Sequence, residues 1–170
     1  HVEAVWTVRP IEEVAIVTWG RVRGESLVAS LAATGLAARA GTPDDVASAD
    51  VVCTCTTSDT PVLDGRLLPD GVHVNAVGAF RSTTRELDGA ALARAAAIVV
   101  ETPEILAAEC GAILLARAEG SLSPDAPVHD LARMLAGPSL RRGERDVTVW
   151  LSSGAAFEDL VVAEAAVGSP

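Results

Sequence analysis

Short runs of β-branched and aliphatic residues alternate with longer mixed segments along the chain. Runs of this length and composition are typical of strands buried in a parallel sheet. The predicted strands cover 14–19, 36–40, 50–56, 72–77, 97–101 and 147–151. The remaining patterned segments predict helices over 1–7, 21–33, 44–49, 88–95, 103–119, 129–135 and 155–167. Strands that alternate with helices in this way predict an α/β fold with a doubly wound parallel sheet.

The segment 72–88 is the one around which this pattern is organised. Its strand breaks at Gly78, and a polar loop over 81–85 follows. Ligands of open α/β sheets lie beyond the carboxyl ends of the strands. Residues 77–79 carry little side chain, so a flat ring or a phosphate could approach the main chain there. A strand-to-helix turn without a ligand fits the same residues.

Several separated segments resemble the ornithine cyclodeaminase/mu-crystallin family, and the resemblance extends over nearly the whole chain. The segments that carry it are 49–63, 73–79, 85–88 and 151–160. It implies a Rossmann-type NAD(P)-binding domain over 1–154 that is incomplete at its N-terminus, because the first strand and the Gly-rich turn of that fold are absent. Residues 155–170 are expected to form a helix that packs toward an N-terminal dimerisation domain outside this chain. A homodimer is therefore expected.

The resemblance also implies which residues bind the dinucleotide. They are Gly20, Arg21, Val22, Thr54, Cys55, Thr56, Val77, Gly78, Ala79 and Ser152. Arg21 stands near the position where an acidic residue would bind the ribose hydroxyls of NAD. A guanidinium binds phosphate oxygens and cannot accept a hydrogen bond from a hydroxyl, so NADP(H) is favoured over NAD(H). From the residues alone, Arg21 and Arg23 fit two solvated side chains equally well.

Phe80 distinguishes between the reactions found in this family. The cyclodeaminases carry an Asp at this position, and Phe has no lone pair with which to handle protons. The resemblance therefore implies an NAD(P)H-dependent reductase of small cyclic ketimines, such as pyrroline-2-carboxylate or piperideine-2-carboxylate. Phe80, Ser153 and Gly154 are expected to line the substrate pocket. No catalytic residue is assigned, because the family's Arg and Lys are expected upstream of His1, and the isolated chain is expected to be inactive.

Three alternatives remain open from the sequence. Two are enzymes: an ornithine or lysine cyclodeaminase, and an alanine-type dehydrogenase. The third is a crystallin-like protein that binds NADP without catalysing a reaction.

Composition narrows the classes of partner. The chain has 170 residues and a net charge of −10, with 49% hydrophobic residues. A polyanion would be repelled, so nucleic acid is not an expected partner. The apolar runs are too short to span a membrane, and no signal-peptide pattern opens the chain. We expect a cytoplasmic protein whose partner is a small imino-acid or amino-acid substrate.

Cysteines and histidines are interpreted as structural. Cys53, Cys55 and Cys110 are expected to be small buried side chains in a reducing compartment, and no metal site is expected. His73 is expected to be a satisfied structural residue. His1 has a weak expected link to the cofactor. Thr57 and Ser58 are expected to cap the turn after their strand.

Overall fold

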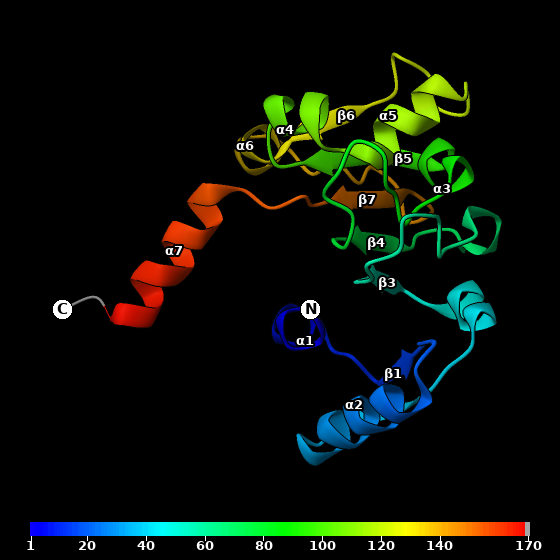
Figure 1. The fold of residues 1–170 in the computed structure, drawn as a ribbon, viewed down its shortest axis with the longest axis vertical. Helices are drawn as coiled ribbons and strands as arrows, with labels where there is room; N and C mark the ends of the chain where they lie inside the picture. Colours follow the sequence, from blue (N-terminus) through cyan, green and yellow to red (C-terminus); the bar gives the residue numbers. More distant parts are fainter. Residues whose placement is uncertain (169–170) are drawn as a thin grey trace. The chain divides into compact units, whose positions relative to one another are not determined.

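A computed structural model describes residues 1–168 of the chain (Figure 1). These residues form two compact units, of which the first covers residues 1–48 and the second begins at Ala49. None of the helices in the described part of the chain is both long and apolar enough to cross a bilayer.

The first unit contains a strand-helix-strand arrangement. Its elements are α1 (Val2–Val8), β1 (Glu13–Ile16), α2 (Arg21–Ala33), β2 (Ala37–Ala40) and the 3₁₀ helix η1 (Pro43–Ser48). β1 and β2 are parallel. The predicted strand over 14–19 is too long, because a Cβ on Gly24 would lie 2.5 Å from the Thr18 methyl group, so the chain has already turned onto α2 at Thr18. The short helix predicted over 44–49 is present as a 3₁₀ helix.

The second unit is built on a parallel sheet with the strand order β3-β4-β7-β5-β6. The strands are β3 (Val51–Thr54), β4 (His73–Ala76), β5 (Ala95–Val100), β6 (Val128–Asp130) and β7 (Val147–Leu151). The helices are η2 (Gly65–Leu67), α3 (Gly89–Ala93), α4 (Pro103–Ala108), α5 (Gly111–Ala118), α6 (Leu131–Ala136) and α7 (Ala156–Val167). All neighbouring strands are parallel, as predicted, so their carboxyl ends meet at one edge of the sheet.

The helix predicted over 103–119 is divided into α4 and α5. A Cβ on Gly111 would lie 2.2 Å from the Thr84 carbonyl oxygen and 2.4 Å from that of Arg81. The loop that follows β4 is therefore packed directly on the start of α5. The break itself lies just before Gly111, where Cys110 has a ψ of 75° and is not helical.

The sequence analysis missed the strand β6. His129 was predicted to begin a helix, but residues 128–130 pair with β5, and α6 begins at Leu131. The Asp130 carboxylate accepts a hydrogen bond from the Arg133 main-chain N–H at 2.7 Å and so caps α6. A strand of three residues that ends in a helix cap has no room for a recognisable periodicity.

The core of the second unit is apolar, and the largest of its fully buried apolar side chains are Leu87, Leu92, Ile98 and Ile113. The predicted burial of the cysteines is correct only for Cys110, since Cys53 and Cys55 are exposed. Both belong to β3 and its end, and in the described residues β3 has a strand partner on one side only. Burial raises the pKa of the Cys110 thiol to about 11, so this thiol is protonated at neutral pH.

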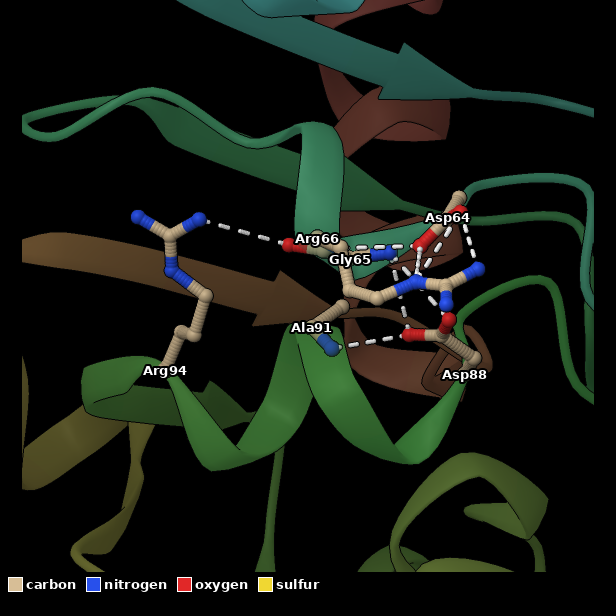
Figure 2. A network of polar contacts seen from close by, with 6 residues as sticks. All are labelled: Asp64, Gly65, Arg66, Asp88, Ala91 and Arg94. Atoms are coloured by element: carbon tan, nitrogen blue, oxygen red, sulfur yellow. Dashed lines mark hydrogen bonds and ion pairs between the residues drawn. The ribbon is translucent and has the colours of Figure 1, made fainter.

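Asp88 joins η2 to α3 through main-chain hydrogen bonds (Figure 2). Its Oδ1 atom accepts hydrogen bonds from the main-chain N–H groups of Ala91 at 2.8 Å and Gly65 at 3.2 Å. No side chain fits at Gly65, because a Cβ there would lie 2.0 Å from the Ala91 nitrogen. The carboxylate thus serves as a helix cap and also holds a closely packed neighbour.

We expect Asp88→Ala to lower the free energy of unfolding by about 1–3 kcal/mol, because it removes the cap and leaves the Gly65 N–H without an acceptor. Asp88→Asn should cost less, since its amide oxygen can keep the shorter bond from Ala91 and loses only the bond of 3.2 Å from the Gly65 N–H to Oδ2. Denaturant unfolding of the complete protein measures both changes. Equal losses from the two variants would contradict this account of Asp88.

Candidate functional site

The carboxyl ends of β3, β4 and β7 lie side by side, because the strands are parallel neighbours in register. Thr54 is opposite Ala76, and Ala76 is opposite Leu151. The ladder continues past the strands, with Val77 N–H donating to the Thr54 carbonyl at 3.0 Å and Ser152 N–H donating to the Ala76 carbonyl at 2.9 Å. The structure therefore brings together the predicted cofactor-binding segments 54–56 and 77–79 with 152–154, in which Ser152 was predicted to meet the cofactor and Ser153 and Gly154 the substrate.

Glu86 connects the first two of these segments from inside the protein. Its side chain is 1% exposed. Oε1 accepts a hydrogen bond from the Thr56 main-chain N–H at 2.5 Å. Oε2 accepts from the Gly78 main-chain N–H at 2.7 Å and from the Thr54 hydroxyl at 2.9 Å. One buried carboxylate thus fixes the ends of two adjacent strands.

The sequence analysis did not assign this role to Glu86. The signal available was weak: a single acidic residue beside Leu87, which is fully buried. A carboxylate beside a buried residue can itself be buried only if hydrogen-bond donors inside the protein replace its water. Nothing in the sequence identifies main-chain N–H groups as those donors.

Position 78 requires glycine because neighbouring protein atoms leave no space for a side chain. A Cβ at this position would lie 2.0 Å from the Thr56 carbonyl oxygen and 2.6 Å from Glu86 Oε1. Its N–H is already donated to Glu86. A ligand at this edge would therefore meet the surface of 77–79 without receiving a hydrogen bond from the Gly78 nitrogen.

A second buried carboxylate holds the third segment. Glu101 directly follows β5 and is 2% exposed. Its Oε1 accepts hydrogen bonds from the main-chain N–H groups of Ser153 at 2.9 Å and Gly154 at 3.0 Å. Its Oε2 has no hydrogen-bond partner in the described part of the chain. Gly154 has a φ of 83°, a conformation that favours glycine.

Two hollows adjoin these strand ends. The smaller one, of about 10 Å³, is lined in part by Ala79, Cys110 and Ser152 and is large enough for about one water molecule. The larger one, of about 220 Å³, is a groove lined by Thr57, Ser58, Asp59, Gly78, Phe80, Arg81 and Thr84. We call it the 57–84 groove.

Phe80 and Arg81 form an exposed pair in the 57–84 groove. Phe80 is 56% exposed, and the Arg81 guanidinium carbon lies 5.1 Å from the centre of its ring. The guanidinium stacks on an aromatic face and has no carboxylate partner in the described residues. The groove therefore offers an apolar wall and an unpaired cation, and Phe80 supplies no group that can transfer a proton.

Several predicted residues have local structural roles. The Ser58 N–H donates to the Thr56 hydroxyl at 3.2 Å, and the Ser58 hydroxyl donates to the Thr60 carbonyl at 2.8 Å, so Ser58 caps the turn as predicted. His73 is hydrogen-bonded to the Thr148 hydroxyl at 2.8 Å and to the Asn75 amide oxygen at 3.2 Å. The predicted structural role of His73 is confirmed.

The predicted residues Gly20, Arg21 and Val22 belong to the first unit. Gly20 is the N-cap residue of α2. Arg21 forms an ion pair with Glu25 at 3.5 Å, one turn along the helix, and both side chains are exposed. Such a pair is weak, so it does not prevent the guanidinium from meeting an anion. His1 is exposed and precedes α1.

Neither thiol chemistry nor metal chemistry is organised in the described residues. Desolvation, then Cys53, then Glu86 raise the pKa of Cys55, so its thiol stays protonated at neutral pH. Within residues 1–168, no group of His, Cys, Asp and Glu side chains is arranged to hold a metal ion.

A parallel sheet with ordered strand ends and an adjoining groove is the arrangement in which open α/β folds bind their ligands, and it is consistent with a Rossmann-type fold. A model of the ornithine cyclodeaminase/mu-crystallin family matches residues 1–167. Delta(1)-pyrroline-2-carboxylate reductase of Colwellia psychrerythraea is 34% identical over 98% of this chain and 54% of its own length. The chain belongs to the ornithine cyclodeaminase/mu-crystallin family.

Solved structures of related enzymes have the same fold. Delta(1)-pyrroline-2-carboxylate reductase of Thermococcus litoralis, in complex with NADH and L-proline, matches with a TM-score of 0.88 and 26% identity over 95% of this chain and 51% of that one. Iminosuccinate reductase of Paracoccus denitrificans, in complex with NAD⁺, matches with a TM-score of 0.86 and 29% identity over 98% of this chain and 51% of that one. The chain spans about half the length of these relatives.

Glu101→Ala should lower the free energy of unfolding of the complete protein by about 2–3 kcal/mol, because two main-chain N–H groups lose their acceptor. Glu101→Gln should lose much less, because only Oε1 is used and an amide oxygen can take its place. Denaturant unfolding measures both. If Glu101→Gln were as damaging as Glu101→Ala, the second carboxylate oxygen would have a role that this account does not give it.

Proposed function

We propose that the complete protein is an NAD(P)H-dependent reductase of small cyclic ketimines, such as pyrroline-2-carboxylate or piperideine-2-carboxylate. The observation that carries the proposal is the row of strand ends at 54–56, 77–79 and 152–154, which is fixed from inside by Glu86 and Glu101. The names of the relatives support the same reaction class. L-proline, present in one of those structures, is the reduction product of pyrroline-2-carboxylate.

The residues at this edge fit a nicotinamide ring. Gly78 lines the 57–84 groove, which would have room for a flat group, and the half-buried Ser152 lines the smaller hollow, where its hydroxyl would bind the ligand. When bound, the reduced nicotinamide would supply the hydride that the imine carbon accepts. The residues of this chain would orient the ring and keep it against a fixed surface. Phe80 would form an apolar wall beside the substrate, with Ser153 and Gly154 completing the pocket.

Phe80 also favours the reductase reaction over the cyclodeaminase reaction. A reductase needs a shaped, partly dry pocket for a protonated C=N bond, and an aromatic wall provides one. A cyclodeaminase needs a group that moves protons at the substrate amine, and Phe80 cannot do this. The remaining proton transfer and the carboxylate binding are proposed to come from residues outside this chain.

NADP(H) is the cofactor that we propose as preferred. Arg21 and Arg23 lie in the first turn of α2, and both side chains are exposed. Two guanidinium groups near a ribose would favour its 2′-phosphate. The solved relatives hold NADH and NAD⁺, so the proposed preference for NADP(H) rests on the two arginines of this chain alone.

The helix α7 is proposed to pack on a second domain that also forms a homodimer. None of its residues is buried in the second unit. Phe157, Leu160, Val161, Val162 and Val167 are exposed apolar side chains on it. Apolar surface of this extent is typical of an interface. We further propose a cytoplasmic location.

The proposed reaction is tested by mixing the complete protein with reduced cofactor and either cyclic imine. We expect the absorbance of the reduced nicotinamide to fall with at least one imine, and to fall faster with NADPH than with NADH. No cofactor consumption with either ring size would contradict the proposal. Ammonia release from ornithine or lysine, or NAD⁺ reduction by alanine, would favour the alternatives.

Phe80→Ala should raise the KM for the cyclic imine by about tenfold, since an apolar wall worth about 1–2 kcal/mol is lost from a partly exposed site. Phe80→Leu retains the apolar bulk and should stay within about threefold of the natural protein. Steady-state kinetics at saturating cofactor measures both. An unchanged KM in Phe80→Ala would place the substrate elsewhere.

A further inference from the structure

We infer that Glu86 is a positioning residue for the bound nicotinamide cofactor, acting through the main chain of Thr56 and Gly78 without touching the ligand. The inference rests on the proposed function, because it assumes that the cofactor meets the strand ends. Glu86 itself points inward and is 1% exposed, so direct contact with a ligand is not its role.

The geometry gives Glu86 control over two strand ends at once. Each of its oxygens accepts from a different segment, Oε1 from Thr56 and Oε2 from Gly78. An ionised carboxylate only accepts hydrogen bonds, so all three of its donors are satisfied together. The distance between the two segments is thereby set by the width of one carboxylate group.

Close packing makes that distance critical. A Cβ on Gly78 would lie 2.0 Å from the Thr56 carbonyl oxygen, so the two segments are too close for any side chain at position 78. A small separation would change the surface that 77–79 presents. A flat ring depends on such a surface for its orientation, and displacements of this size have large effects on binding and reaction.

Glutamine cannot replace Glu86, although it has almost the same shape. Its side chain has one oxygen and one NH₂ group, so in either orientation the NH₂ faces a main-chain N–H group. If the oxygen faces Gly78, the NH₂ opposes Thr56, and the reverse orientation opposes Gly78. Two donors that face each other repel, so one strand end must move.

Asp88 supplies matched controls two residues along the chain. Its carboxylate also accepts from two main-chain N–H groups, but those belong to Gly65 and Ala91, in η2 and α3. Asp88→Asn is the isosteric control, because its amide oxygen can keep the bond from Ala91 and one of the two long bonds that the Gly65 N–H makes to the carboxylate oxygens. Asp88→Ala is the control for lost stability, because it removes an internal acceptor without touching the strand ends.

The test is a fluorescence titration of the complete protein and its variants with NADPH and NADH, alongside the melting temperature. We expect Glu86→Gln to raise the Kd of the preferred cofactor by about tenfold or more, the equivalent of one lost main-chain hydrogen bond. Asp88→Asn and Asp88→Ala should stay within about twofold. At saturating cofactor, the KM for the imine should change less than the cofactor Kd in Glu86→Gln.

The outcomes separate this inference from the proposed function. A natural protein that binds neither cofactor overturns both. A natural protein that binds, with Glu86→Gln binding equally well, overturns the inference alone and leaves Glu86 a purely structural residue. If Glu86→Gln does not fold, Thr54→Val removes only the hydroxyl donor, and we expect a rise of about threefold in the Kd. An unchanged Kd in Thr54→Val would then overturn the inference.

Discussion

The burial of the Glu86 carboxylate is the constraint on which the proposed site depends. A charged group removed from water is tolerated only when internal donors replace the lost hydration. Here the donors are two main-chain N–H groups and one hydroxyl, all from the ends of β3 and β4. Moving either strand end away would leave a buried charge short of partners. The carboxylate therefore makes the position of both ends costly to change.

Glu101 fixes the segment after β7 in a similar way, but it uses its carboxylate oxygens differently. It uses one oxygen for two N–H groups, whereas Glu86 uses both oxygens for two strand ends. The consequence for function is common to both. Main-chain donors at 56, 78, 153 and 154 are directed inward, so a ligand at this edge meets a preorganised surface of small side chains. Such a surface suits a flat ring held by contact and by the Ser152 hydroxyl better than a phosphate bound by main-chain N–H groups.

Much of the fold could be predicted from the sequence. The β-branched runs before residues 54, 77 and 151 gave the strands, and the parallel order followed from their alternation with helices. The resemblance of separated segments gave the family. The failures occurred where structure depends on contacts between distant residues. The loop at 81–84 breaks a helix at Gly111, and β6 exists because residues 128–130 pair with β5.

In the candidate site, too, the local sequence predicted the strand ends but not the contacts between distant residues. The ends of the predicted strands at 54–56, 77–79 and 152 are neighbours, because parallel strands end at one edge, whereas the predicted part of Gly20, Arg21 and Val22 in the same site stays a prediction. Glu86 and Glu101 were missed as organising residues, since their importance comes from burial and from the main-chain groups they face. From the sequence, Gly78 was expected to be a glycine because a ligand approaches the main chain there. The structure supplies a different one, the close approach of the Thr56 carbonyl and the Glu86 carboxylate.

The most direct test is a crystal structure of the complete protein with bound reduced cofactor. The account predicts the nicotinamide ring against residues 77–79 and within hydrogen-bond reach of Ser152, while the Gly78 and Thr56 N–H groups still donate to Glu86. A nicotinamide ring bound away from these strand ends, or a Gly78 N–H that has left Glu86 to bind the ligand, would contradict it.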